Sequence, residues 1–424
     1  MNQLNIALIL FLATYAGMIA FTNYRSYIAL TSAALFVVLG ILPLQQLFSA
    51  IDFNVLLMIA GTMGTVGLFI ESRMPSLLAD HIMDKLPNWK WVILMLSVFA
   101  GLISAFVDNV ATVLMVVPVA LTISKKLGKS PIQPVIAISV ASNLEGAATL
   151  VGDTTSILLG GYAGMNFADF FFYQGKLGLF WIVQISLILA TAMLWRLFRK
   201  EEDRVDVTIW TEVTDLVPTF LLLGTILGLI IVSFLPGMPA LINGYVCMGF
   251  MLLGFLIEGL KHGFKKSFTL WWRHLDYHTL LLLAGLFVVI GGIKEAGVIA
   301  TIAQGFVSLG GDNLFLMYSL ISWASVLLSA FIDNIPYVAT MLPVVTGIAA
   351  HLGIDPTVLY FGLLSGATLG GNLTPIGASA NIAALGLLKK DGLQVKNTDF
   401  MRISVPYTLT AVISGYLIIW FLFA

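Results

Sequence analysis

Long apolar segments recur along the whole chain and are separated by short polar stretches. A helix needs roughly 20 predominantly apolar residues to cross the hydrocarbon core of a bilayer. On this criterion the pattern predicts ten membrane spans, near residues 4–22, 27–43, 54–71, 131–163, 177–198, 217–235, 239–260, 278–294, 356–388 and 404–423. The first segment has no basic n-region and no small-residue cleavage site, so we expect it to be retained as a span. The predicted fold class is an all-α polytopic membrane protein.

Two of the segments between these spans are nearly identical. Ser104-Ala-Phe-Val-Asp-Asn109 and Ser329-Ala-Phe-Ile-Asp-Asn334 each place an Asp-Asn pair inside a long apolar run, and they lie 225 residues apart. The same offset relates Pro118 to Pro343, Pro131 to Pro356, Gly146 to Gly371, Thr149 to Thr374 and Gly152 to Gly377. The chain is therefore an internal duplication. We divide it into a first membrane repeat (1–198), a cytoplasmic linker (199–216) and a second membrane repeat (217–424).

Composition agrees with this pattern and adds some exclusions. With 59% apolar and 10% charged residues, the chain lies outside the range of soluble globular domains. We expect a multi-pass integral membrane protein of a bacterial inner membrane, with membrane lipid and a small ion or small-molecule substrate as partners. The single Cys247 leaves no intramolecular disulfide and no cysteine-based metal cluster. Nothing in the sequence indicates nucleic acid binding, a cofactor or a transition metal.

The 21 Lys and Arg residues predict the orientation of the chain. Suppose that each Asp-Asn segment, near 91–125 and 313–350, enters and leaves on one side while the ten spans cross. Then 19 basic residues share one side, and only Lys176 and Lys294 fall opposite. The positive-inside tendency makes the rich side cytoplasmic and places both termini outside. Two full crossings per segment would give the same result, but the 15 or so apolar residues that flank each Asp-Asn pair favour a half-depth re-entrant hairpin.

Each repeat then holds five spans and one re-entrant hairpin. Because five is odd, the second repeat must be inverted relative to the first, as in many secondary transporters. Segments 72–90 and 296–312 mix apolar and polar residues and predict helices that lie in the membrane interface. The linker from Arg199 to Asp215 carries both signs of charge, and we expect it to be solvated.

Four acidic residues fall at predicted membrane depth: Asp108, Glu145, Asp153 and Asp333. No Lys or Arg is predicted to accompany them. A charged side chain at the bilayer centre costs on the order of 3 kcal/mol on the lenient insertion scale, so each acid needs a reason. The structural alternatives are a protonated carboxyl or a helix cap. These apply most to Glu145, because Gly370 occupies its equivalent position in the second repeat.

The segment 131–163 and its equivalent 356–388 are predicted to be broken helices. Residues 142–156 align with 367–381, and both stretches are dense in Gly and hydroxyl residues, with Pro375 in the second. Such residues unwind a helix, which lipid tolerates only where the freed backbone groups line a cavity. Freed carbonyls and carboxylates suit an alkali cation, and half-helix N-termini suit an anion. Close helix packing is the alternative explanation for the glycines alone.

At these residues the chain resembles the ion-transporter superfamily of membrane carriers. The hairpin pattern Ser-Ala-Phe-x-Asp-Asn with a proline nine residues on, and the later Gly-x-x-Thr-x-x-Gly loop, are similar to the branch of arsenite permeases and NhaD-type sodium/proton antiporters (ArsB/NhaD). The citrate and dicarboxylate carriers are more distant, with Ser-Asn-Thr at the hairpin tip. The first loop here reads Gly-Asp-Thr-Thr-Ser instead of the Gly-Asp-Pro-Pro-Asn of many permeases, which leans toward the cation antiporters.

The resemblance implies a transport domain, made of the hairpins and broken spans, that moves against a scaffold in a homodimer. It assigns the hairpin-tip role to the Asp-Asn pairs and the loop role to the Gly-x-x-Thr-x-x-Gly segments. With the polar residues beside them, the candidate ion- or substrate-binding residues are Ser104, Asp108, Asn109, Asn143, Glu145, Thr149, Gly152, Asp153, Thr154, Thr155, Ser329, Asp333, Asn334, Asn372, Thr374, Gly377, Ser379 and Asn381.

The leading functional hypothesis is an ion-coupled secondary transporter with elevator-like alternating access. In the first version it is a proton-coupled or Na⁺/H⁺ antiporter in which Asp108, Asp153 and Asp333 alternately hold H⁺ and a cation, since carboxyls in a low-dielectric site can exchange the two near neutral pH. In the second version it carries an anion or oxyacid, such as citrate, a dicarboxylate or arsenite, with Na⁺ or H⁺ as the coupling ion. A pore is disfavoured because the inverted repeats with broken helices are typical of alternating access.

An intramembrane enzyme is the remote alternative. An aspartyl protease needs paired membrane aspartates, but the Gly-x-Gly-Asp motif is missing because Leu150 stands where it requires glycine. No His-Glu-x-x-His motif exists for a zinc protease. His274 and His278 have the i,i+4 spacing of metal ligands, yet they flank a span at the predicted cytoplasmic interface without an evident third ligand.

Overall fold

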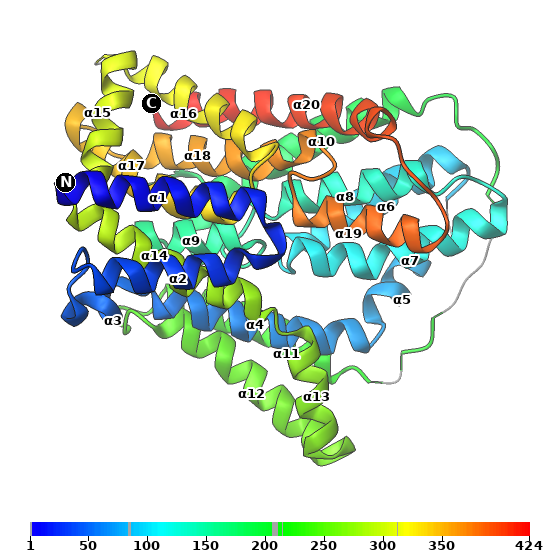
Figure 1. Cartoon of the computed structure of the whole chain (residues 1–424). Helices are drawn as coiled ribbons and strands as arrows, with labels where there is room; N and C mark the ends of the chain where they lie inside the picture. The colour runs from blue at the N-terminus through cyan, green and yellow to red at the C-terminus, as the bar shows by residue number, and fades with distance from the viewer. Residues whose placement is uncertain (1, 84–85, 206–210, 214, 312) are drawn as a thin grey trace.

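Both repeats of the sequence fold into helices in a similar order (Figure 1). The computed structural model describes residues 2–83, 86–205, 211–213, 215–311 and 313–424. The first repeat forms α1 (Gln3–Ala20), α2 (Arg25–Val38), α3 (Leu47–Ala50), α4 (Phe53–Glu71), α5 (Met74–Met83), α6 (Trp89–Ser104), α7 (Asn109–Leu127), α8 (Ile132–Glu145), α9 (Thr154–Ala163) and α10 (Leu179–Leu197). The second forms α11 (Val217–Ser233), α12 (Ile242–His262), α13 (Phe264–His274), α14 (Tyr277–Glu295), α15 (Val298–Gly310), α16 (Leu314–Ser329), α17 (Asn334–Leu352), α18 (Thr357–Gly370), α19 (Ser379–Lys390) and α20 (Asn397–Phe423).

Short elements complete the chain between these helices. Single 3-10 turns occupy Thr22–Tyr24, Leu44–Gln46, Ala168–Phe170 and Gly371–Leu373. Between α9 and α10, β1 (Phe172–Tyr173) pairs antiparallel with β2 (Lys176–Leu177). The all-α class predicted from the apolar pattern is confirmed.

Eight helices in the described part of the chain are long and apolar enough to cross a membrane: α1, α4, α7, α10, α12, α14, α17 and α20. Six of these are spans that the sequence predicts, while α2 and α11 are shorter than expected, at 14 and 17 residues. The other two, α7 and α17, are second arms of the Asp-Asn segments. Each is 19 residues long, because the helix continues past the apolar run to a left-handed glycine, Gly128 or Gly353. The expected arm length of about 15 residues is therefore wrong for α7 and α17, and a re-entrant hairpin in each Asp-Asn segment stays a prediction.

The two spans predicted to be broken are broken. α8 ends at Glu145 and α9 begins at Thr154, while α18 ends at Gly370 and α19 begins at Ser379. In Figure 1, α6, α7, α8 and α19 occupy one half of the bundle, and α9, α16, α17 and α18 occupy the other. The two hairpins, α6–α7 and α16–α17, therefore approach the middle from opposite ends. The inversion of the repeats relative to a membrane stays a prediction.

In one part of the bundle, which we call the scaffold (α2, α4, α12 and α14), each helix packs against a helix of the other repeat. We call these the exchanged pairs. α4 packs against α12, and α14 packs against α2. Gly61 and Gly285 lie at equivalent points of these crossings: a Cβ at Gly61 would lie 2.6 Å from Met248 N, and one at Gly285 would lie 2.9 Å from Leu30 N. Backbones approach this closely only where the residue has no side chain. The two glycines thus allow the paired helices to pack this closely.

The hairpins and broken helices form the second part, which we call the hairpin unit (α6–α9 and α16–α19). α6 packs on α8, and α16 packs on α18. The hairpins also contact the broken helix of the opposite repeat, since α7 packs on α19 and α17 packs on α9. The two repeats are therefore joined at the centre of this unit.

Three connecting segments differ from or refine the expectations. α13 is an additional helix between α12 and α14 that the apolar pattern did not predict. α15 is bent by 117° relative to α16, as a helix within the predicted interfacial segment 296–312 would be (Figure 1). The predicted linker, 199–216, is not simply solvated. Trp89 N donates to Asp203 O at 2.9 Å, and Thr211 Oγ1 donates to Asp80 Oδ2 at 2.6 Å. Positions 206–210 and 214 of the linker lie outside the described residues.

Candidate functional site

Each loop of a broken helix is tied to the turn of its own hairpin. Thr149 Oγ1 donates to Ala105 O in the first repeat, and Thr374 Oγ1 donates to Ala330 O in the second. The loops are closed in the same way as well. Ser156 Oγ donates to Gly146 O at 3.0 Å, and its equivalent, Asn381, donates through Nδ2 to Gly371 O at 3.1 Å. The equivalence expected from the 225-residue offset is therefore present in the contacts.

Backbone carbonyls converge on one glycine in each loop. A Cβ at Gly152 would lie 2.8 Å from Gly146 O, 2.9 Å from Ala105 O and 3.0 Å from Ser104 O. At Gly377 the corresponding distances are 2.6 Å to Gly371 O, 2.8 Å to Ala330 O and 2.9 Å to Ser329 O. Only glycine lets the three carbonyl oxygens approach the loop so closely. Each repeat therefore forms a cluster of hard oxygen atoms where its hairpin turn meets its loop.

The two repeats are joined by hydrogen bonds between buried polar side chains. Asn109 Nδ2 donates to Asn143 Oδ1 at 2.9 Å, and Asn143 Nδ2 donates across to Thr368 O at 2.7 Å. Other bonds across the repeats are Asn372 Nδ2 to Val140 O at 2.9 Å, Ser139 Oγ to Asn381 Oδ1 at 2.6 Å, and Thr155 Oγ1 with Thr368 Oγ1 at 3.1 Å. Buried amides are held rigidly by such bonds, because an unpaired polar group in this environment is costly.

The serines that precede the hairpin turns have equivalent partners. Ser104 Oγ accepts from Ser142 Oγ at 3.1 Å, and Ser329 Oγ donates to Ala367 O. Ala367 is the equivalent of Ser142 at the 225-residue offset. Both serines are buried, so they fix the first arm of each hairpin to the broken helix that follows.

Three of the predicted acids cap helices. Asp108 Oδ1 accepts from Val110 N at 3.0 Å, and Asp333 Oδ1 accepts from Ile335 N at 3.0 Å. Asp153 lies before α9, and its Oδ1 accepts from Thr154 N at 2.7 Å. A carboxylate at a helix N-terminus is favoured by the helix dipole. The cap that the sequence analysis offered as an alternative is thus present in all three cases, but it occupies only part of each carboxylate, which can accept about four hydrogen bonds.

A cavity of about 240 Å³ lies between the scaffold and the hairpin unit. Six candidate residues line it: Asp108, Asn109, Asp153, Thr154, Asn334 and Ser379. The scaffold supplies α4 from Thr62 to Ile70 and the start of α14 with Asp276 and Thr279. The end of α13, just before α14, adds Arg273 and His274. Asn334 of the second hairpin reaches the first loop, since its Nδ2 donates to Asp153 Oδ2 at 3.4 Å. Both hairpin tips and both loops therefore contribute to this one cavity.

A second cavity, of about 550 Å³, lies along the same boundary between scaffold and hairpin unit. It is lined by the start of α4 with Asp52, by the end of α14 with Lys294, by Tyr162 of α9 and by Pro343 of α17. Neither Asp-Asn pair lines it. The hairpin tips therefore line the cavity beside α13 but not the cavity beside Lys294.

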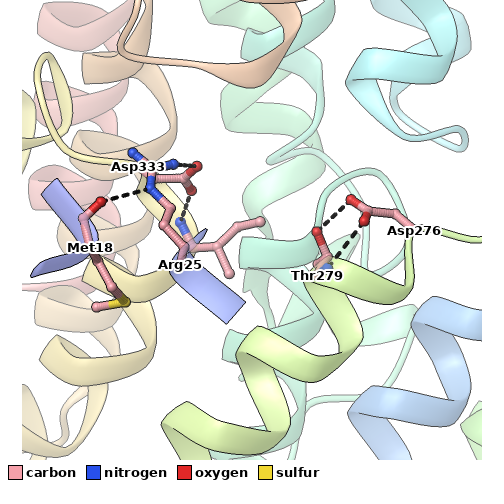
Figure 2. Close-up of polar contacts among 6 residues, drawn as sticks. Met18, Arg25, Asp276, Thr279 and Asp333 are labelled. Atoms are coloured by element: carbon pink, nitrogen blue, oxygen red, sulfur yellow. Dashed lines mark hydrogen bonds and ion pairs between the residues drawn. The ribbon is translucent and has the colours of Figure 1, made fainter. Parts of the chain in front are cut away.

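The expectation that no Lys or Arg accompanies the membrane acids is wrong. Arg25 Nη1 lies 2.8 Å from Asp333 Oδ2, and Figure 2 shows the guanidinium held between this carboxylate and Met18. Arg25 is the first residue of α2 and one of the 19 basic residues that the sequence predicts on the cytoplasmic side. In the fold, the connection between α1 and α2 reaches the tip of the second hairpin, 308 residues away in sequence.

Glu145 is not brought to the cavity. It is fully buried at the end of α8, where its Oε2 accepts from Gln184 Nε2 of α10 at 2.6 Å. Its other oxygen, Oε1, has no hydrogen-bond partner in the described structure. Its Cγ lies 3.0 Å from the position of a Cβ at Gly101, so it faces α6. Of the four candidate acids, Asp108 and Asp153 line the cavity, whereas Glu145 and the Arg25-paired Asp333 do not.

Several residues of the site are not among the candidates predicted from the sequence. Thr368 is the equivalent of Asn143, so the alignment of the two repeats held a signal for it. Asp276 caps α14 by accepting from Thr279 N at 3.1 Å and Thr279 Oγ1 at 2.6 Å, and Figure 2 shows this pair (Figure 2). Arg273, Asp276 and Arg25 follow no pattern along the chain that separates them from other interfacial polar residues.

The two histidines with i,i+4 spacing do not converge. His274 Nε2 lies 3.1 Å from Glu71 Oε1, whereas His278 Nδ1 lies 3.2 Å from Ser26 Oγ. Within the part of the chain that the structure describes, no three His, Cys, Asp or Glu residues are placed to hold a metal ion.

Known proteins resemble this chain over nearly its whole length. It matches the family described as Citrate transporter over residues 9–366. An uncharacterized transporter of Mycobacterium tuberculosis is 32% identical over 98% of this chain and 97% of its own length. The 46 kDa membrane protein of Mycobacterium leprae is 32% identical over 98% of each chain. The P protein of Homo sapiens is 25% identical over 98% of this chain and 59% of its own length.

Two solved structures resemble the fold. The YdaH transporter of Alcanivorax borkumensis superposes with a TM-score of 0.58, covering 88% of this chain and 86% of its own, at 15% identity. MtrF of Neisseria gonorrhoeae superposes with a TM-score of 0.56, covering 99% of this chain and 94% of its own, at 14% identity. At these identities the likeness concerns the fold alone.

Proposed function

Because this chain belongs to the citrate transporter family, we propose that it is a secondary active transporter that couples a small carboxylate anion to a cation. Membership makes it a transporter in a membrane and not an enzyme, so the protease alternative is set aside. The family match also shows that this chain is more closely related to the citrate carriers than its hairpin motif suggested. The anion, the coupling ion and the transport movement are the parts that we propose.

The observation that carries this proposal is that anion-binding and cation-binding groups share one cavity. Thr154 and Ser379 are the first residues of α9 and α19, at equivalent positions of the two repeats, and both line the cavity with Arg273. Helix N-termini and a guanidinium favour a carboxylate ligand. Asp108 and Asp153 line the same cavity and favour a cation.

Coupling follows from the charges of this cavity. An anion that enters meets the carboxylates of Asp108 and Asp153, and like charges in a low-dielectric site repel. A cation bound at these carboxylates removes the repulsion, so the anion binds well only when the cation is present. Na⁺ and H⁺ both satisfy this requirement, since hard oxygen ligands suit the first and carboxylates accept the second.

The transport movement that we propose is elevator-like. The cavity lies at the boundary between scaffold and hairpin unit, and it borders the end of α13, which the distribution of basic residues predicts to be cytoplasmic. In this conformation the site faces the cytoplasm. A shift of the hairpin unit along α4 and α14 would carry the site toward the cavity beside Lys294. We also propose a homodimer in which the scaffold stays fixed.

Uptake by purified protein in proteoliposomes tests the proposal. We expect citrate or a related carboxylate to accumulate only when an inward Na⁺ or proton gradient is imposed, and Asp153→Asn to abolish the accumulation. Thr269→Ala, an exposed substitution on α13 outside the cavity, is the control and should transport normally. Accumulation that is indifferent to both gradients would contradict the coupling.

A second candidate is cation/proton antiport without an anion. Its supporting observation is that Asp108 and Asp153 lie in one cavity, where one can hold H⁺ while the other holds a cation. The ion pair between Arg25 and Asp333 weakens the version that uses three free acids. Na⁺-driven proton flux in proteoliposomes that contain no organic anion would establish antiport; proton flux that requires the anion would exclude it.

A further inference from the structure

The two hairpin tips have the same sequence and the same cap, but different electrostatic partners. Asp333 at the second tip forms an ion pair with Arg25, with 2.8 Å between Oδ2 and Nη1. Asp108 at the first tip lines the cavity. Within the described residues, no basic side chain lies within ion-pair distance of Asp108. One tip is neutralised by the protein itself, and the other is open to a ligand.

Arg25 is held in place from both sides. Its Nε donates to Met18 O, in the last turn of α1, at 3.2 Å, and its Nη1 donates to Asp333. The side chains of Arg25 and Asp333 are only 24% and 15% exposed. The guanidinium therefore bridges the end of α1 and the start of α17 as a positioned group (Figure 2).

The location of Arg25 needs this partner. It is the first residue of α2 and lies beside the start of α17, and a positive charge is disfavoured at a helix N-terminus. The carboxylate of Asp333 offsets that cost. Arg keeps its charge at every accessible pH, so the pair cannot be neutralised by proton loss from the guanidinium.

We propose that Arg25 is a tethered cation that occupies, at the second hairpin tip, the place that a coupling cation takes at the first. The inference rests on the proposed cation coupling at Asp108. It assigns Arg25 as the residue that sets how many hairpin-tip carboxylates take part in coupling: Asp108 is available to Na⁺ or H⁺ in each transport cycle, and Asp333 is permanently paired. Two equivalent tips thus bind one exchangeable cation.

A latch between α1–α2 and the second hairpin is the competing explanation. A latch would change the rate of transport or the stability of one conformation when it is removed. It would not create a cation site. A tethered cation, by contrast, leaves a vacant carboxylate with unfilled acceptor positions when the guanidinium is removed, and a free cation can bind there.

The test is the number of Na⁺ ions bound per chain by the purified full-length protein in detergent. Radioactive Na⁺ serves as the probe, with choline as the replacing ion and no organic anion present. We expect Arg25→Gln to bind one more Na⁺ per chain than the native protein. The double variant Arg25→Gln/Asp333→Asn should lose the extra ion, and Arg25→Lys, which keeps a tethered charge, should not gain one. Arg196→Gln is the matched control, since it removes an exposed arginine in the last turn of α10, outside the cavity, and leaves the Arg25 pair intact.

A gain of Na⁺ in Arg25→Gln that the double variant keeps would overturn the inference, and so would the absence of any gain. A second measurement requires no change at Arg25: Asp108→Asn should abolish Na⁺ binding by the otherwise native protein, whereas Asp333→Asn should leave it unchanged. Equal loss in these two variants would also overturn the tethered-cation assignment. If the native protein binds no Na⁺ but Arg25→Gln binds one, the proposed Na⁺ coupling at Asp108 fails while the assignment of Arg25 stands.

Discussion

The two hairpin tips are alike in construction and different in charge. In each, a threonine ties the loop to the turn, three carbonyl oxygens approach one glycine, and an aspartate caps the second arm. Yet Asp108 faces a cavity that it shares with Asp153, and Asp333 is paired with Arg25. The difference shows that duplication preserved the mechanical parts of the site, while residues from outside the repeat motif made the electrostatics of the two tips unequal.

The asymmetry extends to the loops. Asp153 of the first loop has Ala378 as its equivalent in the second, so the second loop supplies no carboxylate at this point. Within the hairpin unit, the first repeat therefore provides both acids of the cavity, and the second provides Asn334 and Ser379. Because the two repeats contribute unequally to the site, we expect substitutions in them to differ in the size of their effects.

Of the substitutions that compare the two repeats, removal of the first-tip acid should have the largest effect on transport. Asp108→Asn preserves the shape of the side chain but removes the charge that we assign to the cation. We expect uptake to fall by roughly 10- to 100-fold, because losing a hydrogen bond to a charged group costs about 1.5–3 kcal/mol. Asp333→Asn, measured in the same vesicles, should be less severe, since no exchangeable cation is assigned to it. Equal losses in both variants would remove the contrast between the tips.

The shared construction predicts equal sensitivity in the two loops. Gly152→Ala and Gly377→Ala each place a methyl group within 3.0 Å of three carbonyl oxygens. We expect each to destabilise the protein by about 1–3 kcal/mol, the usual range for overpacking, and to lower its thermal unfolding midpoint in detergent. Gly386→Ala in α19 is the control, because nothing lies within 4 Å of its Cβ position. If one of the two variants leaves the unfolding midpoint unchanged while the other lowers it, the two carbonyl clusters are not equivalent.

In the two exchanged pairs of the scaffold, we expect glycine substitutions to cause losses of stability that are again similar to each other but smaller than those in the loops. Gly61→Ala and Gly285→Ala push apart α4 and α12 in one case and α14 and α2 in the other. Neighbouring backbone atoms lie 2.6 Å and 2.9 Å from the new methyl positions, so we expect a loss on the order of 1 kcal/mol each. Gly249→Ala, on α12 with open space around it, should leave the unfolding midpoint unchanged. If only one of the two variants lowers the unfolding midpoint, the two helix crossings do not contribute equally to stability.

Glu145 should respond least, although it is a fully buried acid of the first repeat. Glu145→Gln keeps an acceptor for Gln184, and the side chain does not line the cavity. We expect uptake within about threefold of the native protein, less than 1 kcal/mol by the usual conversion. A loss as large as that of Asp108→Asn would instead place Glu145 in the coupling mechanism and extend the first-repeat site to α10.

Much of this site could be predicted from sequence because it depends on local chemistry. The 225-residue offset identified the two hairpin turns, and the dense Gly, Thr and Ser residues located both helix breaks between Glu145 and Thr154 and between Gly370 and Ser379. Arm length was predicted less well: α7 and α17 extend to Gly128 and Gly353, since a helix stops where a left-handed residue ends it rather than where hydrophobicity ends.

The sequence by itself determined the helices, the duplication, the breaks and the candidate carboxylates, since apolar length, glycine and proline act through neighbouring residues. Only the tertiary structure decided which side chains from distant helices meet. It brought Arg25 from the start of α2 to Asp333, turned Glu145 toward Gln184, and placed Arg273 and Asp276 in one cavity with Asp108. Charged and polar groups interact only when they are close in space. The packing of helices from the two repeats sets these distances, and no local sequence pattern connects the residues involved.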